Sequence, residues 1–299
     1  MFFLFYKHNR DYLLTGLEKI QTRGYDGAGI ATMGTKGGGM VSTKSLVVYK
    51  SHVNIPFPQT HFHFVWLYHI HFNLFPKTSI LFIQSIVKKS SPDDKLDPIQ
   101  MVRDASHPVF GHSIGIAHTR WATHGSITDR NAHPHLDASG NIAVVHNGSI
   151  LNKQVLRKEL KALGYKFEGQ TDTEVIAKLI GHYYDRGKVD IREATEKAMK
   201  RCEGAWGLVV MCSDLPEELV VTSNGSPLYI GVGDEGTFVA SNPSAFKGVS
   251  RNFIKLDDRE VATITVDGRN LDLTKQISHK HDDEEKASPA PYPHFYIKE

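Results

Sequence analysis

Apolar residues recur at helical spacing in four parts of the chain. Leu13, Leu14, Leu17 and Ile20 lie three or four positions apart and predict a helix over residues 11–21, which the glycine-containing segment 23–27 ends. Residues 152–163, 173–184 and 191–202 carry the same pattern. The chain therefore contains amphipathic helices, three of them grouped near the middle of the sequence.

Short apolar runs separated by turn sequences predict strands. They cover residues 28–33, 44–50, 142–146, 207–212, 218–222, 228–232, 237–241 and 260–266. Several are joined by only a few residues, as in ASGN and GDEG, and such short connections imply antiparallel pairing. Antiparallel strands with helices grouped between them predict an α+β layered fold rather than a doubly wound parallel sheet.

Composition excludes some classes of partner. The 299 residues include 35 basic and 33 acidic side chains, and a net charge of +2 without basic stripes does not attract nucleic acid. Two cysteines, Cys202 and Cys212, are too few for a disulfide framework and fit a reducing compartment, so we expect a cytoplasmic protein. Both lie on apolar faces, which predicts core packing.

The chain opens with MFFLFY, which is too short and has no basic flank for a signal peptide. Residues 53–84 are strongly apolar, but Pro56, Pro58 and Pro76 interrupt them, and no membrane span is expected. No charged residue occurs between Lys50 and Lys77. We interpret the opening and the block 51–84 as translated non-coding sequence or errors of the gene model.

These features define an expected domain organisation. Residues 1–275 are predicted to form one domain, with 51–106 as an atypical insert and solvated connector. Residues 276–291 are charged and contain proline, which predicts a linker, and residues 292–299 begin a further region. Two His-x-His pairs at His61, His63, His69 and His71 could bind zinc, but no acidic or thiol ligand accompanies them. We expect neither a metal nor a cofactor.

Polar residues concentrate at residues 118–125, HTRWATHG. Such a density of polar groups suits a binding loop, in which Arg120 could hold a carboxylate through two parallel hydrogen bonds. A plain structural loop accounts equally well for the composition.

Two further segments have both a chemical and a structural interpretation. Asn147 and Gly148 follow a predicted buried strand and could donate to a developing oxyanion, although Asn-Gly is also the commonest hairpin turn pair and the residues alone favour a turn. Thr171, Asp172 and Glu174 precede an apolar helix and form a capping signal. Asp172 would bind a ligand only if other residues converge on it.

Taken together, GIAHTRWATHG, VVHNG and QTDTE in this order resemble the class II glutamine amidotransferases. The Trp-Ala-Thr-His motif favours the branch of this family that uses fructose 6-phosphate. The same branch has sequences similar to RGYD at 23–26, GSPL at 225–228 and PYPHFYIKE at the end. The resemblance covers residues 11–50 and 107–299. It implies an N-terminal-nucleophile fold, which is a four-layer sandwich of two antiparallel sheets between helical layers. It also implies an activity that releases ammonia from glutamine.

The resemblance also implies residue roles. Arg120 would bind the α-carboxylate of glutamine and Asp172 its α-ammonium group, while Asn147 and Gly148 would stabilise the oxyanion. Further implied substrate-binding residues are Trp121, Thr123 and His124, on a loop that closes over glutamine, and His133 and Arg23 behind the site.

The family nucleophile is a cysteine exposed as residue one, whereas this chain has Phe2. The resemblance thus predicts a glutamine-dependent aminotransferase portion whose own glutaminase activity is absent. Fructose 6-phosphate would bind only through sugar-isomerase domains that follow, and a homo-oligomer is expected only with them. The alternatives are a non-catalytic glutamine-binding copy and a non-functional fragment.

Overall fold

The structure is a computed structural model that describes residues 2–5, 9–19, 27–34, 83–91, 97–105, 112–120, 125–184, 188–233, 236–248, 250–265 and 278–279. Contacts divide the chain into one unit of residues 1–35 and 81–299, to which all of these belong, and a second of residues 36–80. The predicted strand 44–50, the block 51–84 up to residue 82, the histidine pairs and residues 292–299 lie outside the described residues.

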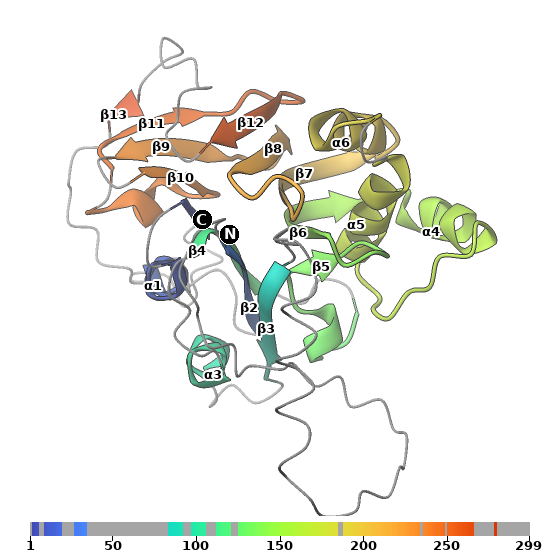
Figure 1. Ribbon diagram of the computed structural model, residues 1–299, viewed down its shortest axis with the longest axis horizontal. Coiled ribbons are helices and arrows are strands. Elements are labelled where there is room, and N and C mark those ends of the chain that lie inside the picture. The colour runs from blue at the N-terminus through green and yellow to red at the C-terminus, as the bar shows by residue number, and fades with distance from the viewer. Residues whose placement is uncertain are drawn as a thin grey trace, which may run out of the picture. The chain divides into compact units, whose positions relative to one another are not determined.

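Two antiparallel sheets form the centre of the first unit (Figure 1). The eight-stranded sheet has the order β13-β11-β9-β10-β1-β4-β2-β3 and the five-stranded sheet the order β12-β8-β7-β6-β5. Their strands are β1 (Phe2–Phe5), β2 (Gly27–Gly34), β3 (Ile83–Ser90), β4 (His112–Arg120), β5 (His135–Leu136), β6 (Ile142–Ile150), β7 (Gly204–Cys212), β8 (Glu218–Asn224), β9 (Tyr229–Gly233), β10 (Gly236–Ala240), β11 (Asn252–Lys255), β12 (Val261–Thr265) and β13 (Ser278–His279).

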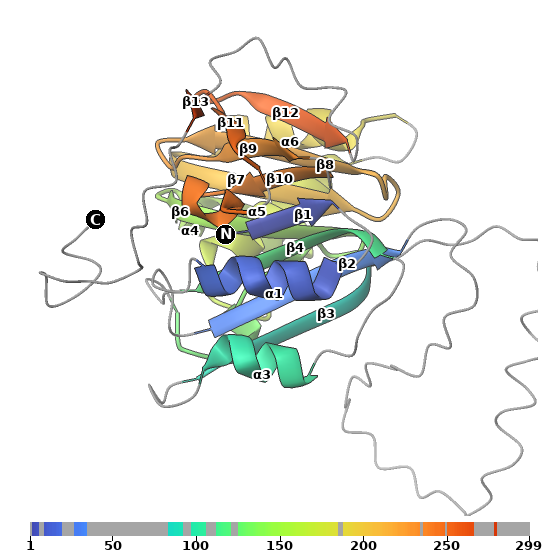
Figure 2. The same ribbon diagram turned by 90° about the vertical axis from the view of Figure 1, so that its left-hand side faces the viewer.

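Helices cover the outer face of each sheet (Figures 1 and 2). The eight-stranded sheet is covered by α1 (Asn9–Lys19) and α3 (Pro98–Ala105), and the five-stranded sheet by α4 (Lys153–Ala162), α5 (Asp172–Tyr183) and α6 (Ile191–Lys200). Short 3-10 helices η2 (Asp129–Asn131) and η3 (Pro243–Phe246) lie in connections. The predicted α+β sandwich of two antiparallel sheets between helical layers is confirmed.

Three hydrophobic clusters separate these four layers. Along β6, Ile142 and Val144 pack toward α4, α5 and α6, whereas Ala143 and Val145 pack toward the other sheet. This alternation follows from the two-residue period of a strand and gives both faces of β6 an apolar partner. The third cluster lies under α1 and α3, where Leu13 and its neighbours pack on the eight-stranded sheet.

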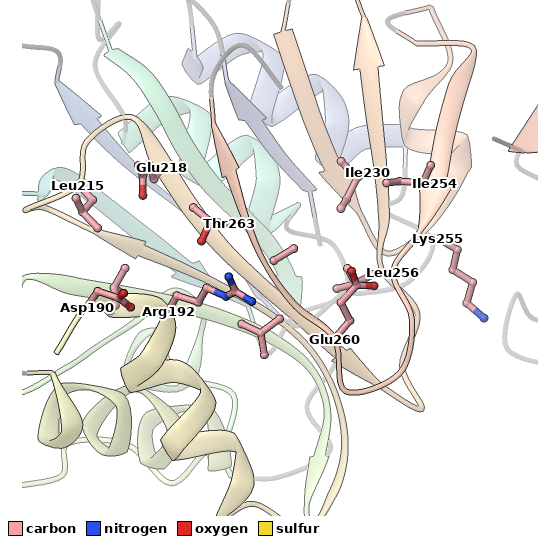
Figure 3. Close-up of a pocket in the computed structure, with 13 residues that line it drawn as sticks. Asp190, Arg192, Leu215, Glu218, Ile230, Ile254, Lys255, Leu256, Glu260 and Thr263 are labelled. Atoms are coloured by element: carbon pink, nitrogen blue, oxygen red, sulfur yellow. The ribbon is translucent and has the colours of Figure 1, made fainter. Parts of the chain in front are cut away.

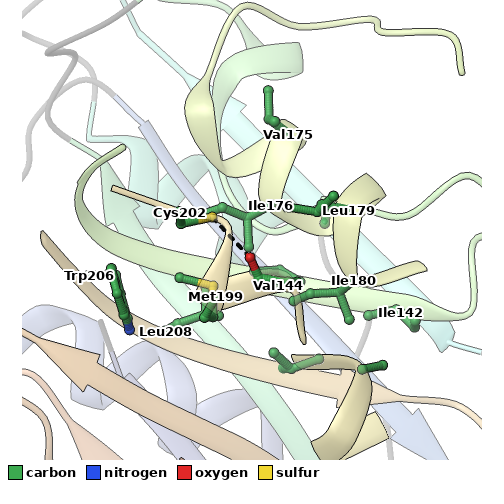
Figure 4. Close-up of a cluster of buried hydrophobic side chains, with 14 of the residues drawn as sticks. Ile142, Val144, Val175, Ile176, Leu179, Ile180, Met199, Cys202, Trp206 and Leu208 are labelled. Atoms are coloured by element: carbon green, nitrogen blue, oxygen red, sulfur yellow. Dashed lines mark hydrogen bonds between the residues drawn. The ribbon is translucent and has the colours of Figure 1, made fainter. Parts of the chain in front are cut away.

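Both cysteines belong to the cluster under α5 and α6, as predicted, and Figure 4 shows Cys202 among its side chains. The Cys202 thiol donates to the Ala198 carbonyl at 3.5 Å, and burial raises its pKa to about 12. Burial also raises the pKa of Cys212. Neither thiol is poised to act as a nucleophile, because the thiolate is the reactive species.

The segment 51–106, expected to be an atypical insert and connector, contains two regular elements near its end. β3 pairs with β2 from Gly27 to Met33, and its lysines suit the edge of a sheet. In α3, Ile99 and Val102 are buried one turn apart, and the Asp97 carboxylate accepts the Ile99 amide at 2.8 Å. The charged residues around this short apolar face conceal its helical period in the sequence.

The predicted linker 276–291 also begins with structure, since Ser278 and His279 of β13 pair with β11. The opening segment contributes β1, which lies between β10 and β4. Its interpretation as non-coding sequence stays a prediction. Among the helices that the structure describes, none is long and apolar enough to cross a membrane.

Candidate functional site

The polar run that starts at His118 begins inside a strand. His118, Thr119 and Arg120 are the last three residues of β4 and are buried, each exposing 5% or less of its surface. Trp121, Thr123 and His124, predicted on a closing loop, and Arg23, predicted behind the site, lie outside the described residues. Arg120 therefore lies at the end of β4, where the chain leaves the sheet.

The Arg120 guanidinium is held by the segment that follows this loop. Its Nη1 donates to the Ser126 carbonyl at 3.3 Å and its Nη2 to the Gly125 carbonyl at 3.4 Å. Gly125 has a φ of +81°, and a Cβ there would lie 2.9 Å from Asn131 Nδ2. A glycine is needed at this position, both for its backbone conformation and for the close approach.

Asn147 and Gly148 lie within β6, not in a hairpin turn. They pair with Gly207 and Trp206 of β7, and the strand continues to Ile150. Gly148 has a φ of +130°, and a Cβ there would lie 2.1 Å from the Ala205 carbonyl oxygen. The turn interpretation is wrong because pairing with β7 outweighs the local preference of an Asn-Gly pair.

A hydrogen bond joins the two sheets at this site. His118 Nε2, on β4, lies 2.9 Å from Asn147 Oδ1, on β6. An amide oxygen only accepts hydrogen bonds, so His118 carries its proton on Nε2. The bond occupies the oxygen of the Asn147 amide and leaves its NH₂ group for another acceptor.

His118 and three further buried histidines cluster at this contact. The His133 ring lies 4.0 Å from the His118 ring, centroid to centroid, and 5.0 Å from that of His135. His135 Nε2 contacts Thr171 Oγ1 at 3.1 Å, and His146 Nδ1 contacts Thr173 Oγ1 at 3.1 Å. Burial lowers the pKa of all four side chains, so they are neutral at pH 7.

Asp172 is the first residue of α5 and connects that helix to β6. Its Oδ2 accepts the Ile150 amide at 2.9 Å and its Oδ1 accepts the Thr173 amide at 3.0 Å. Thr171 caps the helix, as predicted, by accepting the Glu174 amide at 3.2 Å. The predicted helix cap is therefore present, and a backbone amide of β6 also meets the Asp172 carboxylate.

Glu174 holds the loop that leads into Asp172. Its carboxylate accepts the amides of Glu168 and Gly169 at 2.8 and 2.9 Å, and Arg157 and Lys178 lie 3.8 and 3.7 Å from it. Sequence reasoning assigned Glu174 only to the capping signal. The buried i,i+4 pair with Lys178 is the one local signal that could have identified it.

Lys88 is a second residue that the sequence did not single out. It lies on β3, its Nζ is 3.5 Å from the Arg130 carbonyl, and desolvation lowers its pKa to about 8 despite nearby carboxylates. In the sheet, Gly29 pairs with Lys88 on one side and with His118 on the other. Lys88 therefore adds a partly buried cation to the polar layer around the histidines.

A cavity of about 650 Å³ lies elsewhere, between α6 and strands β8, β9, β11 and β12 (Figure 3). Charged side chains of both signs line it, including Arg192 and Glu260, together with apolar residues such as Ile254. None of the residues predicted for the site lines this cavity. Among the described residues, no group of His, Cys, Asp and Glu side chains could hold a metal ion.

A family model described as a glutamine amidotransferase domain matches residues 118–248. The match includes the described residues from His118 to Asp172 that form the contacts above. The chain belongs to the glutamine amidotransferase family. Arg120, Asn147, Gly148 and Asp172 all lie within the matched residues.

Among the glutamine amidotransferases, curated relatives with similar sequences are glutamine–fructose-6-phosphate aminotransferases. The chain is 43% identical over 210 residues to a glutamine–fructose-6-phosphate aminotransferase (isomerizing) of Neisseria meningitidis, covering 67% of this chain and 34% of the relative. It is 34% identical over 295 residues to the enzyme of the same name from Pseudomonas syringae, covering 96% of this chain and 39% of the relative. The chain thus spans between a third and two-fifths of these relatives.

Two solved enzyme structures share the fold. A glutamine phosphoribosylpyrophosphate amidotransferase from B. subtilis matches with a TM-score of 0.61 and 19% identity, covering 94% of this chain and 49% of that one. An allosteric regulatory enzyme of purine biosynthesis matches with a TM-score of 0.62 and 21% identity, covering 88% and 46%. The predicted N-terminal-nucleophile type of sandwich is confirmed.

Proposed function

We propose that this chain is the glutamine-binding portion of a glutamine–fructose-6-phosphate aminotransferase. The observation that carries the proposal is the His118–Asn147 hydrogen bond, because it brings the end of β4, with Arg120, against β6, with Asn147 and Gly148. Asp172 is tied to the same strand two residues beyond Gly148 through the Ile150 amide. A guanidinium, a carboxylate and amide donors then surround one end of β6.

Each group matches one part of glutamine. Arg120 pairs with the α-carboxylate through two parallel hydrogen bonds, and Asp172 accepts the α-ammonium group. The Asn147 NH₂ group, oriented by His118, and the Gly148 amide donate to the oxyanion that forms when the side-chain amide is attacked. Trp121, Thr123 and His124 close over the substrate, and His133 supports His118 from behind.

The complete protein would convert fructose 6-phosphate and glutamine to glucosamine 6-phosphate and glutamate in the cytoplasm. Regions beyond this chain would bind the sugar phosphate and form the homo-oligomer. The chain itself would bind glutamine without hydrolysing it, because β1 is FFLF and offers no thiol or hydroxyl. The buried thiols of Cys202 and Cys212 do not replace it.

The test is isothermal titration of the whole chain with L-glutamine. We expect binding, and we expect Arg120→Lys to weaken it at least about tenfold through loss of charge-assisted hydrogen bonds. Arg192→Lys, at an exposed ion pair with Glu196, is the matched control and should leave the affinity unchanged. No measurable binding, or equal affinity in the Arg120 variant, would refute the proposal.

A further inference from the structure

Asn131 connects the two segments that carry the predicted charge partners of glutamine. Asn131 Nδ2 donates to the Ser126 carbonyl at 2.9 Å, and Asn131 Oδ1 accepts the Gln170 amide at 2.8 Å. A carbonyl can only accept and a backbone amide can only donate, so chemistry fixes the orientation of the Asn131 side chain. One amide group thus bridges a segment that follows Arg120 and one that precedes Asp172.

On the first side, the contact reaches Arg120 through one atom. The Ser126 carbonyl oxygen accepts from both Asn131 Nδ2 and Arg120 Nη1. Moving this carbonyl therefore moves a partner of the guanidinium. Gln170 adds a second link, because its Oε1 accepts the Ser126 amide at 3.2 Å.

On the second side, the contact reaches Asp172 through the backbone. The Gln170 amide, held by Asn131, lies two residues before Asp172. Between them, Thr171 caps α5, so the position of Gln170 determines how the chain enters the helix whose first residue is Asp172. Displacement of this segment would shift the carboxylate relative to Arg120.

The Asn131 side chain has no room to swing away. It exposes 2% of its surface. A Cβ at Gly125 would lie 2.9 Å from its Nδ2, and a Cβ at Gly169 would lie 2.8 Å from its Oδ1. Glycine on both sides lets the two segments close on the amide, and the bridge has a single geometry.

We propose that Asn131, assisted by Gln170, is a positioning residue that sets the spacing between the Arg120 guanidinium and the Asp172 carboxylate. Recognition of the α-carboxylate and of the α-ammonium group then becomes interdependent, which makes the site specific for an intact α-amino acid. The inference rests on the proposed function, since it takes these two residues as the ligands of glutamine.

The test compares three compounds by titration of the whole chain: L-glutamine, glutarate monoamide, which lacks the ammonium group, and 4-aminobutanamide, which lacks the carboxylate. Asn131→Asp keeps the size and the acceptor but turns an oxygen toward the Ser126 carbonyl. We expect it to weaken glutamine binding by about tenfold, within the usual range of coupling between sites. The dissociation constants of the two single-charge compounds should change less than about threefold.

Asn141→Asp is the matched control, because Asn141 makes side-chain hydrogen bonds with Ser139 and Ser213 in a distant turn. If Asn131→Asp does not fold, Gln170→Ala removes only the bond to the Ser126 amide at an exposed residue and should produce the same selective loss at a smaller amplitude. Equal losses for all three compounds, or unchanged glutamine affinity, would overturn the inference. Failure of the Arg120→Lys variant to weaken binding would instead overturn the proposed function.

Discussion

His118 and Asn147 are 29 positions apart in sequence, yet His118 Nε2 lies 2.9 Å from Asn147 Oδ1. The bond crosses from the eight-stranded to the five-stranded sheet, and the His133 ring lies against the His118 ring behind it. Burial lowers the pKa of His118 and keeps the ring neutral, although the bond to Asn147 acts in the opposite direction. The same buried layer links the chemistry of the site to the stability of the fold.

Stability should fall as the pH falls below about 6.5. The folded-state pKa values of His118, His133, His135 and His146 lie below their unfolded value of about 6.5, so the unfolded chain binds more protons in this range. Each histidine contributes a slope of about 1.4 kcal/mol per pH unit below its unfolded pKa. Urea unfolding between pH 7.5 and 5.5 measures the total slope.

His135→Gln removes a side chain that takes up a proton in the unfolded chain. The slope of the free energy of unfolding against pH should therefore fall by up to about 1.4 kcal/mol per pH unit. A free energy of unfolding that does not change between pH 7.5 and 5.5 would contradict the assignment of these histidines as neutral.

Gly148→Ala should destabilise the fold by about 3 kcal/mol or more, because it combines an unfavourable φ with a clash against the Ala205 carbonyl. Gly140→Ala is the matched control. Gly140 also has a positive φ, of 76°, but nothing lies within 4 Å of the position that a Cβ would take there, so a cost of about 1–2 kcal/mol is expected. Chemical denaturation of both variants measures the difference, and equal costs would rule out the clash.

Glu174→Ala should destabilise the protein by about 3–5 kcal/mol, because it leaves the amides of Glu168 and Gly169 and the nearby cations without their acceptor. Glu193→Ala breaks the exposed i,i+4 pair with Lys197 and should cost less than about 1 kcal/mol. Thermal or urea unfolding of the two variants provides the comparison. A small effect at Glu174 would show that the 168–171 segment does not depend on this carboxylate.

Phe2→Cys, prepared with Met1 removed, should confer glutaminase activity. Phe2 pairs with Ala117 of β4, the residue before His118, so a cysteine there would begin β1 next to the proposed oxyanion donors. Release of glutamate from glutamine measures the gain, with Phe2→Cys carrying Asn147→Ala as a control that should lose it. Glutamate production by the unmodified chain would refute the proposed lack of a nucleophile.

Local pattern accounts for the elements that sequence analysis placed well. α4, α5 and α6 carry one apolar face each, and their boundaries lie within about two residues of the prediction. β3 and α3 were not predicted, because their apolar patterns are short and surrounded by charged residues. They become evident only from the pairing of β3 with β2 and the packing of Ile99 and Val102. The Asn147–Gly148 pair was ambiguous for a different reason: its turn preference is local, whereas its strand pairing with β7 is not.

The fold class, the family resemblance, the capping of α5 and the core location of both cysteines could all be predicted from the amino-acid sequence, because each depends on residues close together along the chain. Three contacts emerge only in the folded protein: His118 bonds to Asn147, Asp172 binds the Ile150 amide, and Asn131 bridges Ser126 and Gln170. These partners lie on strands and loops whose proximity arises when the sheets and helices stack. A hydrogen bond needs its two atoms about 3 Å apart, and no local pattern specifies that distance.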